Sequence, residues 1–188
     1  MVVPADLDGL PRLPGVEHRF VRVHDLRMHV AEAGAGEPML LLHGFPGSWW
    51  SWRHVLGPLS ERYRVICPDL RGTGATDAPA HGYDRRTLLA DVAGLLDELR
   101  IDRAHLVGHD WGALIAFALA LDRPDRVRSV LSLATPHPYA RLSTALAAEM
   151  WRLWFQGVVA APGARPASAP GAQPAPGATP PGRVRRQA

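Results

Sequence analysis

The chain has 188 residues, of which 47% are hydrophobic and 21% charged, a balance typical of a globular protein with one core. Its net charge is +3, but residues 160–188 hold four arginines and no acid, so the remainder is close to neutral. A nucleic-acid-binding domain, which needs a folded basic face, is therefore not expected. No apolar run reaches the roughly 18 residues that a membrane span needs, and residues 1–10 lack the pattern of a signal peptide.

Cys67 is the single cysteine. It leaves no partner for an internal disulfide, excludes a metal site built from cysteines alone, and fits a reducing compartment, so we expect a cytoplasmic protein. No G-x-G-x-x-G or Walker pattern opens a helix, and a nucleotide site is not expected. We therefore predict no metal and no cofactor. The sequence does not indicate an oligomeric state.

Short apolar or alternating runs predict strands at residues 20–24, 27–33, 38–43, 64–68, 104–108 and 127–134, with a turn at Asp25–Leu26. Helical patterns occupy residues 49–62, 85–100, 111–122 and 139–156. The second of these is amphipathic, and the third is apolar on all sides, so we expect it to be buried. The alternation predicts an α/β fold, with a mostly parallel sheet covered by helices on both faces.

One five-residue segment, Gly108-His109-Asp110-Trp111-Gly112, directly follows a predicted strand and opens a predicted helix. That is the context of a nucleophile elbow, in which two glycines allow a sharp turn that exposes the central side chain. The central residue is aspartate, whose carboxylate is ionised at neutral pH and can displace a leaving group from an sp³ carbon to form an ester. The alternative is an aspartate that caps the helix.

A second segment, His43-Gly44-Phe45-Pro46-Gly47, follows an earlier buried strand. Elbow chemistry needs two backbone N–H donors, one from the residue after the nucleophile and one from such a loop. The N–H groups of Trp111 and Phe45 fit these roles, whereas Pro46 has no N–H and stiffens the loop. We interpret His43 as a structural, hydrogen-bonded histidine rather than a proton carrier.

A third segment, Pro68-Asp69-Leu70-Arg71-Gly72-Thr73-Gly74, follows the next strand. Because the carboxyl ends of parallel strands meet at one edge of a sheet, this turn-rich loop should lie beside the other two segments. We expect Asp69 to organise the loop as a hydrogen-bond acceptor rather than to act as a catalyst.

Together HGFPGSWWSWR, PDLRGTGATDAP and GHDWGALIAFALALDRPDRV resemble the epoxide hydrolase branch of the α/β-hydrolase superfamily, over about the first 156 residues. The resemblance implies a mostly parallel sheet of eight strands with a helical cap after the sixth. It also implies that Asp110 attacks an epoxide carbon, that Phe45 and Trp111 donate to the oxyanion, and that a histidine with a second acid hydrolyses the ester. His43, Gly44, Pro46, Gly108, His109 and Gly112 would support this site.

Two alternatives remain open. Haloalkane dehalogenases of the same superfamily also use an elbow aspartate followed by tryptophan, but usually have asparagine where this chain has Phe45. Haloacid-type relatives share HGFP but tend to have arginine at the position of Trp111. The second alternative, which is not an enzyme, is a non-catalytic remnant or binding module that keeps the fold.

The resemblance ends near Gln156. The last histidine is His137, which would be a poor substitute for the catalytic base. The resemblance also implies a second acid, cap tyrosines that polarise the epoxide oxygen, and two last strands, and none of these has a counterpart in the chain. We therefore expect a partial core with the start of a cap at residues 1–156, impaired turnover, and an apolar edge at strand 127–134 that invites aggregation. Residues 157–188, rich in proline, alanine and glycine, are expected to be a disordered tail; a proline-rich interaction segment is the alternative.

Overall fold

The computed structural model describes residues 2–3 and 9–135, all within the first of two compact units, Met1–Ala140. His137, the helix predicted at 139–156, the domain boundary at 156 and the predicted tail at 157–188 lie outside the described residues. The account that follows concerns the described part of the first unit.

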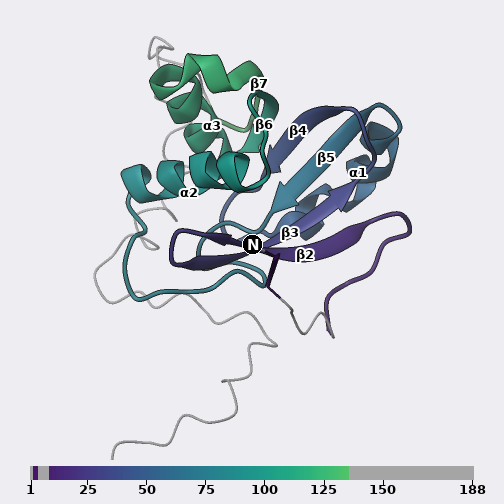
Figure 1. The fold of residues 1–188 in the computed structure, drawn as a ribbon, viewed down its shortest axis with the longest axis horizontal. Helices are drawn as coiled ribbons and strands as arrows, with labels where there is room; N and C mark the ends of the chain where they lie inside the picture. Colours follow the sequence, from purple (N-terminus) through teal and green to yellow (C-terminus); the bar gives the residue numbers. More distant parts are fainter. Residues whose placement is uncertain (1, 4–8, 136–188) are drawn as a thin grey trace, which may run out of the picture. The chain divides into compact units, whose positions relative to one another are not determined.

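Seven strands form one sheet in the order β1-β2-β3-β5-β4-β6-β7 (Figure 1). Strands β5, β4, β6 and β7 are mutually parallel, while β3 runs antiparallel to both β2 and β5. The six predicted strands and the mostly parallel sheet are confirmed, and a two-residue strand β1 is added at its edge. The bounds are β1 Val2–Val3, β2 Glu17–Val23, β3 Leu26–Ala33, β4 Glu37–Leu42, β5 Tyr63–Pro68, β6 Ala104–His109 and β7 Val127–Leu133.

The turn between β2 and β3 is His24–Asp25, and the predicted turn at Asp25–Leu26 is wrong by one residue. Val23 pairs directly with Leu26, and His24 has a φ of 55°, as tight two-residue hairpins require at their first position. Leu26 is fully buried, so the burial of its side chain fixes the register of the hairpin.

The helices are η1 Trp49–Trp52, α1 Arg53–Ser60, α2 Arg85–Glu98, α3 Trp111–Asp122 and η2 Pro124–Arg126. The helix predicted at 49–62 therefore begins with a 3₁₀ turn and ends two residues early. Helix α2 starts where predicted because the Asp84 carboxylate accepts the Thr87 N–H at 3.1 Å and caps it.

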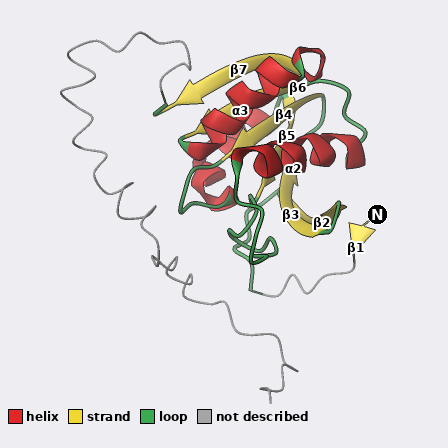
Figure 2. Cartoon of the chain, turned by 90° about the vertical axis from the view of Figure 1, so that its left-hand side faces the viewer, coloured by secondary structure: helices red, strands yellow, loops and turns green. Residues whose placement is uncertain are grey.

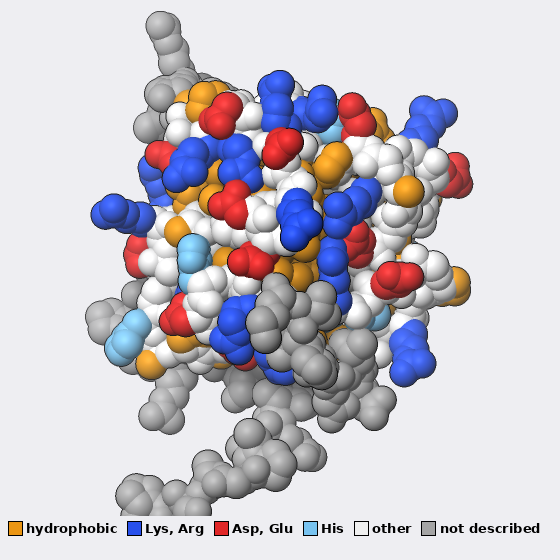
Figure 3. Space-filling model, viewed as in Figure 1, with side chains coloured by type: hydrophobic (Ala, Val, Ile, Leu, Met, Phe, Trp, Pro, Cys, Tyr) orange, Lys and Arg blue, Asp and Glu red, His pale blue; other side chains and the backbone are white. Residues whose placement is uncertain are grey.

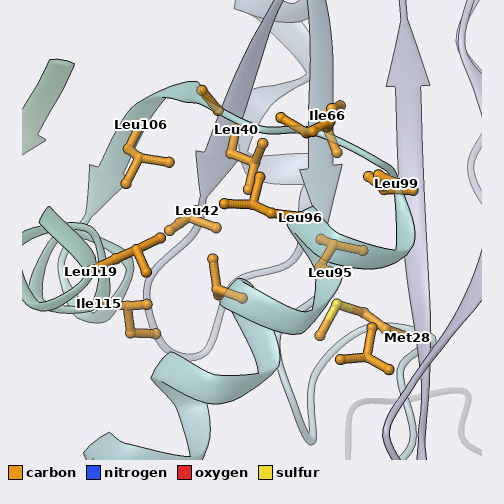
Figure 4. Close-up of a cluster of buried hydrophobic side chains, with 14 of the residues drawn as sticks. Met28, Leu40, Leu42, Ile66, Leu95, Leu96, Leu99, Leu106, Ile115 and Leu119 are labelled. Atoms are coloured by element: carbon orange, nitrogen blue, oxygen red, sulfur yellow. The ribbon is translucent and has the colours of Figure 1, made fainter. Parts of the chain in front are cut away.

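Helices cover both faces of the sheet, with α2 and α3 on one and η1 and α1 on the other (Figures 1 and 2). Alternate residues of β4 serve the two layers: Leu40 and Leu42 join the cluster under α2 and α3, while Met39 and Leu41 join the cluster under α1. The first cluster is drawn in Figure 4, where Leu95 and Leu96 of α2 approach the strand side chains. Burial on both faces explains the unbroken apolar run of β4.

Helix α3 is buried on one side only, so the expectation of burial on all sides is wrong. Its first residue, Trp111, is 47% exposed and Leu121 is 58% exposed, whereas Ile115, Ala116 and Leu119 are buried. The strand beneath it, β7, has β6 on one side and, within residues 2–3 and 9–135, no strand on the other. Leu131 of β7 is 55% exposed, so the expected apolar edge is confirmed for the described sheet; β7 forms its outer end in Figure 2.

The face turned to the viewer in Figure 3 carries arginine and acidic side chains interspersed over α2 and its surroundings, with smaller apolar areas between them. Charges of both signs on neighbouring positions do not build the single-sign field of a polyanion-binding surface. No helix in the described part of the chain is long and apolar enough to cross a bilayer.

Candidate active site

Asp110 occupies a sharp bend between β6, which ends at His109, and α3, which begins at Trp111. Its backbone has φ 51° and ψ −116°, a conformation that costs a residue other than glycine about 1–3 kcal/mol and persists only when its surroundings fix it. Its N–H donates to the Leu133 carbonyl at 3.1 Å, and its carbonyl accepts the Ala113 N–H at 3.0 Å and the Thr135 hydroxyl at 3.0 Å. The bend is thus held by both β7 and α3.

The Asp110 side chain does not cap α3, so the helix-cap alternative is wrong. Instead its Oδ1 accepts the Phe45 N–H at 3.3 Å across 65 residues of sequence. The predicted second donor, the Trp111 N–H, has no acceptor among the described residues. It lies at the first position of α3, where helix N–H groups lack intrahelical partners.

Three glycines let the elbow and the loop after β4 approach each other. A Cβ on Gly44 would lie 2.6 Å from the Asp110 Cβ and 3.0 Å from the His109 Nδ1. A Cβ on Gly112 would lie 2.0 Å from the Leu42 carbonyl oxygen, and one on Gly108 would lie 2.4 Å from the Ala113 Cα. None of these positions has room for a side chain, which is the steric reason for glycine at each.

His43 is buried and has a hydrogen bond at each ring nitrogen. Its Nδ1 donates to the Gly44 carbonyl at 2.9 Å, and its Nε2 accepts the Leu70 N–H at 3.0 Å. Burial lowers the pKa of His43 from 6.5, which keeps the ring neutral with its proton on Nδ1. These contacts agree with the structural interpretation of this histidine. The adjacent Phe45–Pro46 peptide bond is cis.

Asp69 is fully buried, and its carboxylate joins three segments. Oδ1 accepts the Trp49 N–H at 2.7 Å, while Oδ2 accepts the Ala75 N–H at 2.9 Å and lies 2.8 Å from the His29 Nδ1. The expectation that Asp69 organises its loop as an acceptor is confirmed. The contact with His29 was not predicted, since nothing in the sequence links positions forty residues apart.

A buried ion pair beside this loop was also missed. Arg71 donates from Nε and Nη2 to the two oxygens of Asp91 at 2.7 and 2.8 Å, and both side chains are buried. The hydrogen bonds to Asp91 raise the pKa of Arg71. The available signal was Asp91 itself, because an acid between Leu88 and Leu95 interrupts the apolar face of α2 and requires a partner.

Apolar side chains flank the elbow on its open side. Phe45, in the loop after β4, and Trp111, directly after Asp110, are each nearly half exposed. A cavity of about 600 Å³ lies elsewhere, at the start of β6, between Arg100, Arg103 and Asp125. Within residues 2–3 and 9–135, no three histidine, cysteine or acidic residues are grouped as metal ligands.

A family model described as the alpha/beta hydrolase fold matches residues 37–177. The chain belongs to this family. The match includes Phe45, the bend at Asp110 and strands β4 to β7.

The similar proteins include several epoxide hydrolases. Epoxide hydrolase 2 of Siraitia grosvenorii is 49% identical over 122 residues, which are 63% of this chain and 39% of that protein. A soluble epoxide hydrolase of a Corynebacterium species is 42% identical over 118 residues, which are 63% of this chain and 41% of that protein. The chain thus spans about two fifths of these relatives.

Solved structures give the same result for the fold. The crystal structure of an epoxide hydrolase from Vigna radiata matches with a TM-score of 0.64 and 42% identity, over 71% of this chain and 46% of that one. A protein named Cfl2 from Burkholderia cenocepacia matches with a TM-score of 0.66 and 35% identity, over 80% of this chain and 56% of that one. The expected resemblance to epoxide hydrolases is therefore confirmed.

Proposed function

We propose that this chain carries the nucleophile of an epoxide hydrolase and that Asp110 attacks a carbon of an epoxide. The hydrogen bond from the Phe45 N–H to Asp110 Oδ1, at 3.3 Å, is the observation that most supports this proposal. It holds one carboxylate oxygen at a bend that exposes the side chain. The names of the similar proteins supply the substrate class.

The reaction would use the other oxygen. Asp110 Oδ2 accepts no hydrogen bond from the described residues and is the oxygen that we propose attacks. A new bond forms between Oδ2 and the epoxide carbon, the ring C–O bond breaks, and the alkoxide that is released takes a proton from water. The product is an ester of Asp110, and no cofactor is required.

The surroundings favour an apolar substrate. Phe45, whose N–H binds the carboxylate, and Trp111, the residue after Asp110, both have half-exposed aromatic side chains, and such rings bury apolar groups well. The N–H of Trp111, which has no acceptor among the described residues, lies at the start of α3, where the helix dipole favours negative charge. We propose that this N–H and that of Phe45 stabilise the oxyanion when water attacks the ester.

Hydrolysis of the ester is the step that we propose is impaired in the 188-residue chain. It needs a base beside the ester, and the described histidines include none hydrogen-bonded to Asp110. His43 and His29 already use their Nδ1 atoms to bind Gly44 and Asp69, while His105 binds Ser129 and Glu37. We therefore propose that the ester accumulates instead of turning over.

Mass spectrometry tests both the formation of the ester on Asp110 and its impaired hydrolysis. The purified chain is incubated with styrene oxide, its intact mass is followed, and the modified peptide is mapped. We expect one adduct on Asp110, lost in Asp110→Asn and kept in Asp84→Asn, a matched surface carboxylate. An unmodified chain, or an adduct elsewhere, would support the non-catalytic alternative. Repeated formation of diol without a lasting adduct would contradict the impaired second step alone.

A further inference from the structure

The loop that carries Phe45 is fastened at both ends by two consecutive residues of the loop after β5. We call residues 43–48 the donor loop. At its start, the Leu70 N–H donates to His43 Nε2 at 3.0 Å; just after its end, the Trp49 N–H donates to Asp69 Oδ1 at 2.7 Å. His43, Asp69 and Trp49 are all buried, so water does not compete for these bonds and they restrict the loop strongly.

The direction of the Phe45 N–H follows from the carbonyl on the other side of the same peptide group. The Gly44 carbonyl oxygen accepts two hydrogen bonds, one from His43 Nδ1 at 2.9 Å and one from the Gly47 N–H at 2.7 Å. A trans peptide is planar, with its N–H opposite its C=O. Fixing the Gly44 oxygen therefore directs the Phe45 N–H the opposite way, toward Asp110.

Two histidines, the buried His29 and the partly buried His18, orient the Asp69 carboxylate in turn. Both Asp69 oxygens accept backbone N–H groups, so we assign the shared proton to His29 Nδ1, which donates to Oδ2 at 2.8 Å. His29 Nε2 is then an acceptor and receives His18 Nδ1 at 3.1 Å. The rings of His18 and His29 stack with centroids 5.2 Å apart, and Trp49 packs edge-on against His18.

We propose that Asp69, oriented by His29, is a positioning residue that aims the Phe45 N–H at Asp110: its carboxylate holds the end of the donor loop at Trp49, while the N–H of the adjacent Leu70 holds the start at His43. Neither residue touches the substrate position. Their effect passes from His29 to Asp69, from Asp69 and Leu70 to the ends of the donor loop, and from there to Phe45. The kinetic part of this inference rests on the proposed function; the structural part does not.

Two variants with an amide side chain at position 29, asparagine and glutamine, test the proposal. Asparagine places its NH₂ near the Nδ1 position and keeps the donor to Asp69, whereas glutamine reaches toward the Nε2 position and does not. Both are uncharged and polar, so His29→Asn and His29→Gln differ mainly in this contact. Asp84→Ala, which removes another carboxylate that accepts a backbone N–H, controls for lost stability remote from the donor loop.

The first measurement is the ¹H–¹⁵N spectrum and amide hydrogen exchange of Phe45 and Trp49. We expect both amides to shift and to exchange faster in His29→Gln, and to return to their parent positions in His29→Asn. Asp84→Ala should leave them unmoved. Unchanged amides in His29→Gln, equal changes in both His29 variants, or the same changes in Asp84→Ala would each overturn the proposal.

The second measurement is the rate of Asp110 modification at increasing styrene oxide. We expect His29→Gln to lower the limiting rate constant about tenfold, because small misplacements of reacting groups have large rate effects, with the half-saturating concentration unchanged. His29→Asn should restore the rate. A change in half-saturation alone would contradict the proposal.

Failure of the proposed function, and failure of a variant to fold, can each be distinguished from failure of the positioning role. If the parent chain forms no adduct, the proposed function fails while the amide measurement still decides whether Asp69 positions the loop. If His29→Gln does not fold, Asp69→Asn disturbs the same contact from the other side, because its NH₂ then faces the His29 Nδ1–H. The Phe45 amide must shift in that variant too, and an unmoved resonance would refute the positioning role.

Discussion

The loops after β4, β5 and β6 and the outer strand β7 differ in how their side chains are satisfied. In the loops, the polar residues His43, Asp69 and Arg71 are buried and each has partners within hydrogen-bond distance. On β7, Leu131 and Leu133 are apolar and exposed. In the loops, other described residues satisfy the hydrogen bonds of the buried polar side chains, whereas β7 presents apolar surface to solvent.

This difference indicates which properties each region controls. Removing a buried polar partner leaves the other group without water or a hydrogen bond, so substitutions in the loops should cost much stability. Exposed leucines contribute little to the folded state, but they favour association between chains, above all on a strand edge. We therefore expect stability to depend on the loops, and solubility on β7.

The largest effect is expected from the buried ion pair. Arg71→Met leaves the Asp91 carboxylate buried without a partner and should lower the free energy of unfolding by about 3–5 kcal/mol, while the double variant Arg71→Met/Asp91→Leu should recover most of the loss. Urea unfolding measures both. Arg128 of β7 forms an exposed ion pair with Glu37 of β4. Arg128→Met should leave the free energy of unfolding unchanged. Equal losses at the two pairs would erase the contrast between the regions.

A second large effect is expected at the closest approach of the elbow to β4. Gly112→Ala places a Cβ 2.0 Å from the Leu42 carbonyl and should cost about 3 kcal/mol through overpacking. Gly57→Ala, in α1 with nothing within 4 Å of the new Cβ, should instead stabilise the chain by about 0.5–1 kcal/mol, because alanine is the better helix former. Thermal unfolding compares them, and a stable Gly112→Ala would show that the elbow can relax.

A smaller effect concerns pH. Burial lowers the pKa of both His18 and His43 from 6.5. Below that value the unfolded chain takes up protons that the folded chain does not, so stability falls from about pH 6.5 downward until the folded pKa is reached. His18→Asn keeps a donor to His29 and removes one titrating group, which should reduce the stability difference between about pH 7.5 and about pH 5.5. An unchanged difference in urea unfolding would argue against this origin.

The smallest effect on stability is expected on β7. Leu131→Thr/Leu133→Thr introduces β-branched residues, which suit a strand, and should change the free energy of unfolding by no more than about 0.5 kcal/mol. Self-association in sedimentation velocity should decrease, because the apolar edge is reduced. Leu106→Thr, on neighbouring β6 but fully buried, should be strongly destabilising. If the double variant associates as the parent does, the exposed leucines are not the cause.

Much of the fold and of the candidate site could be predicted because the signals are local. The unbroken apolar run of β4, the spaced leucines of α2 and the glycines around Asp110 each report the requirements of their own segment. The prediction for α3 was wrong because an apolar sequence states that a helix can be buried, but not which of its sides the sheet covers. Leu121 is apolar and 58% exposed.

The amino-acid sequence by itself determined the order of strands and helices, the elbow around Asp110, the Phe45 donor and the family resemblance, since periodicity, glycine spacing and short motifs are properties of adjacent residues. Only the tertiary structure decided that hydrogen bonds link His18, His29 and Asp69, that Arg71 pairs with Asp91, and which side of α3 the sheet covers. Hydrogen-bond direction and burial depend on segments far apart in the chain, and these meet only when the sheet assembles.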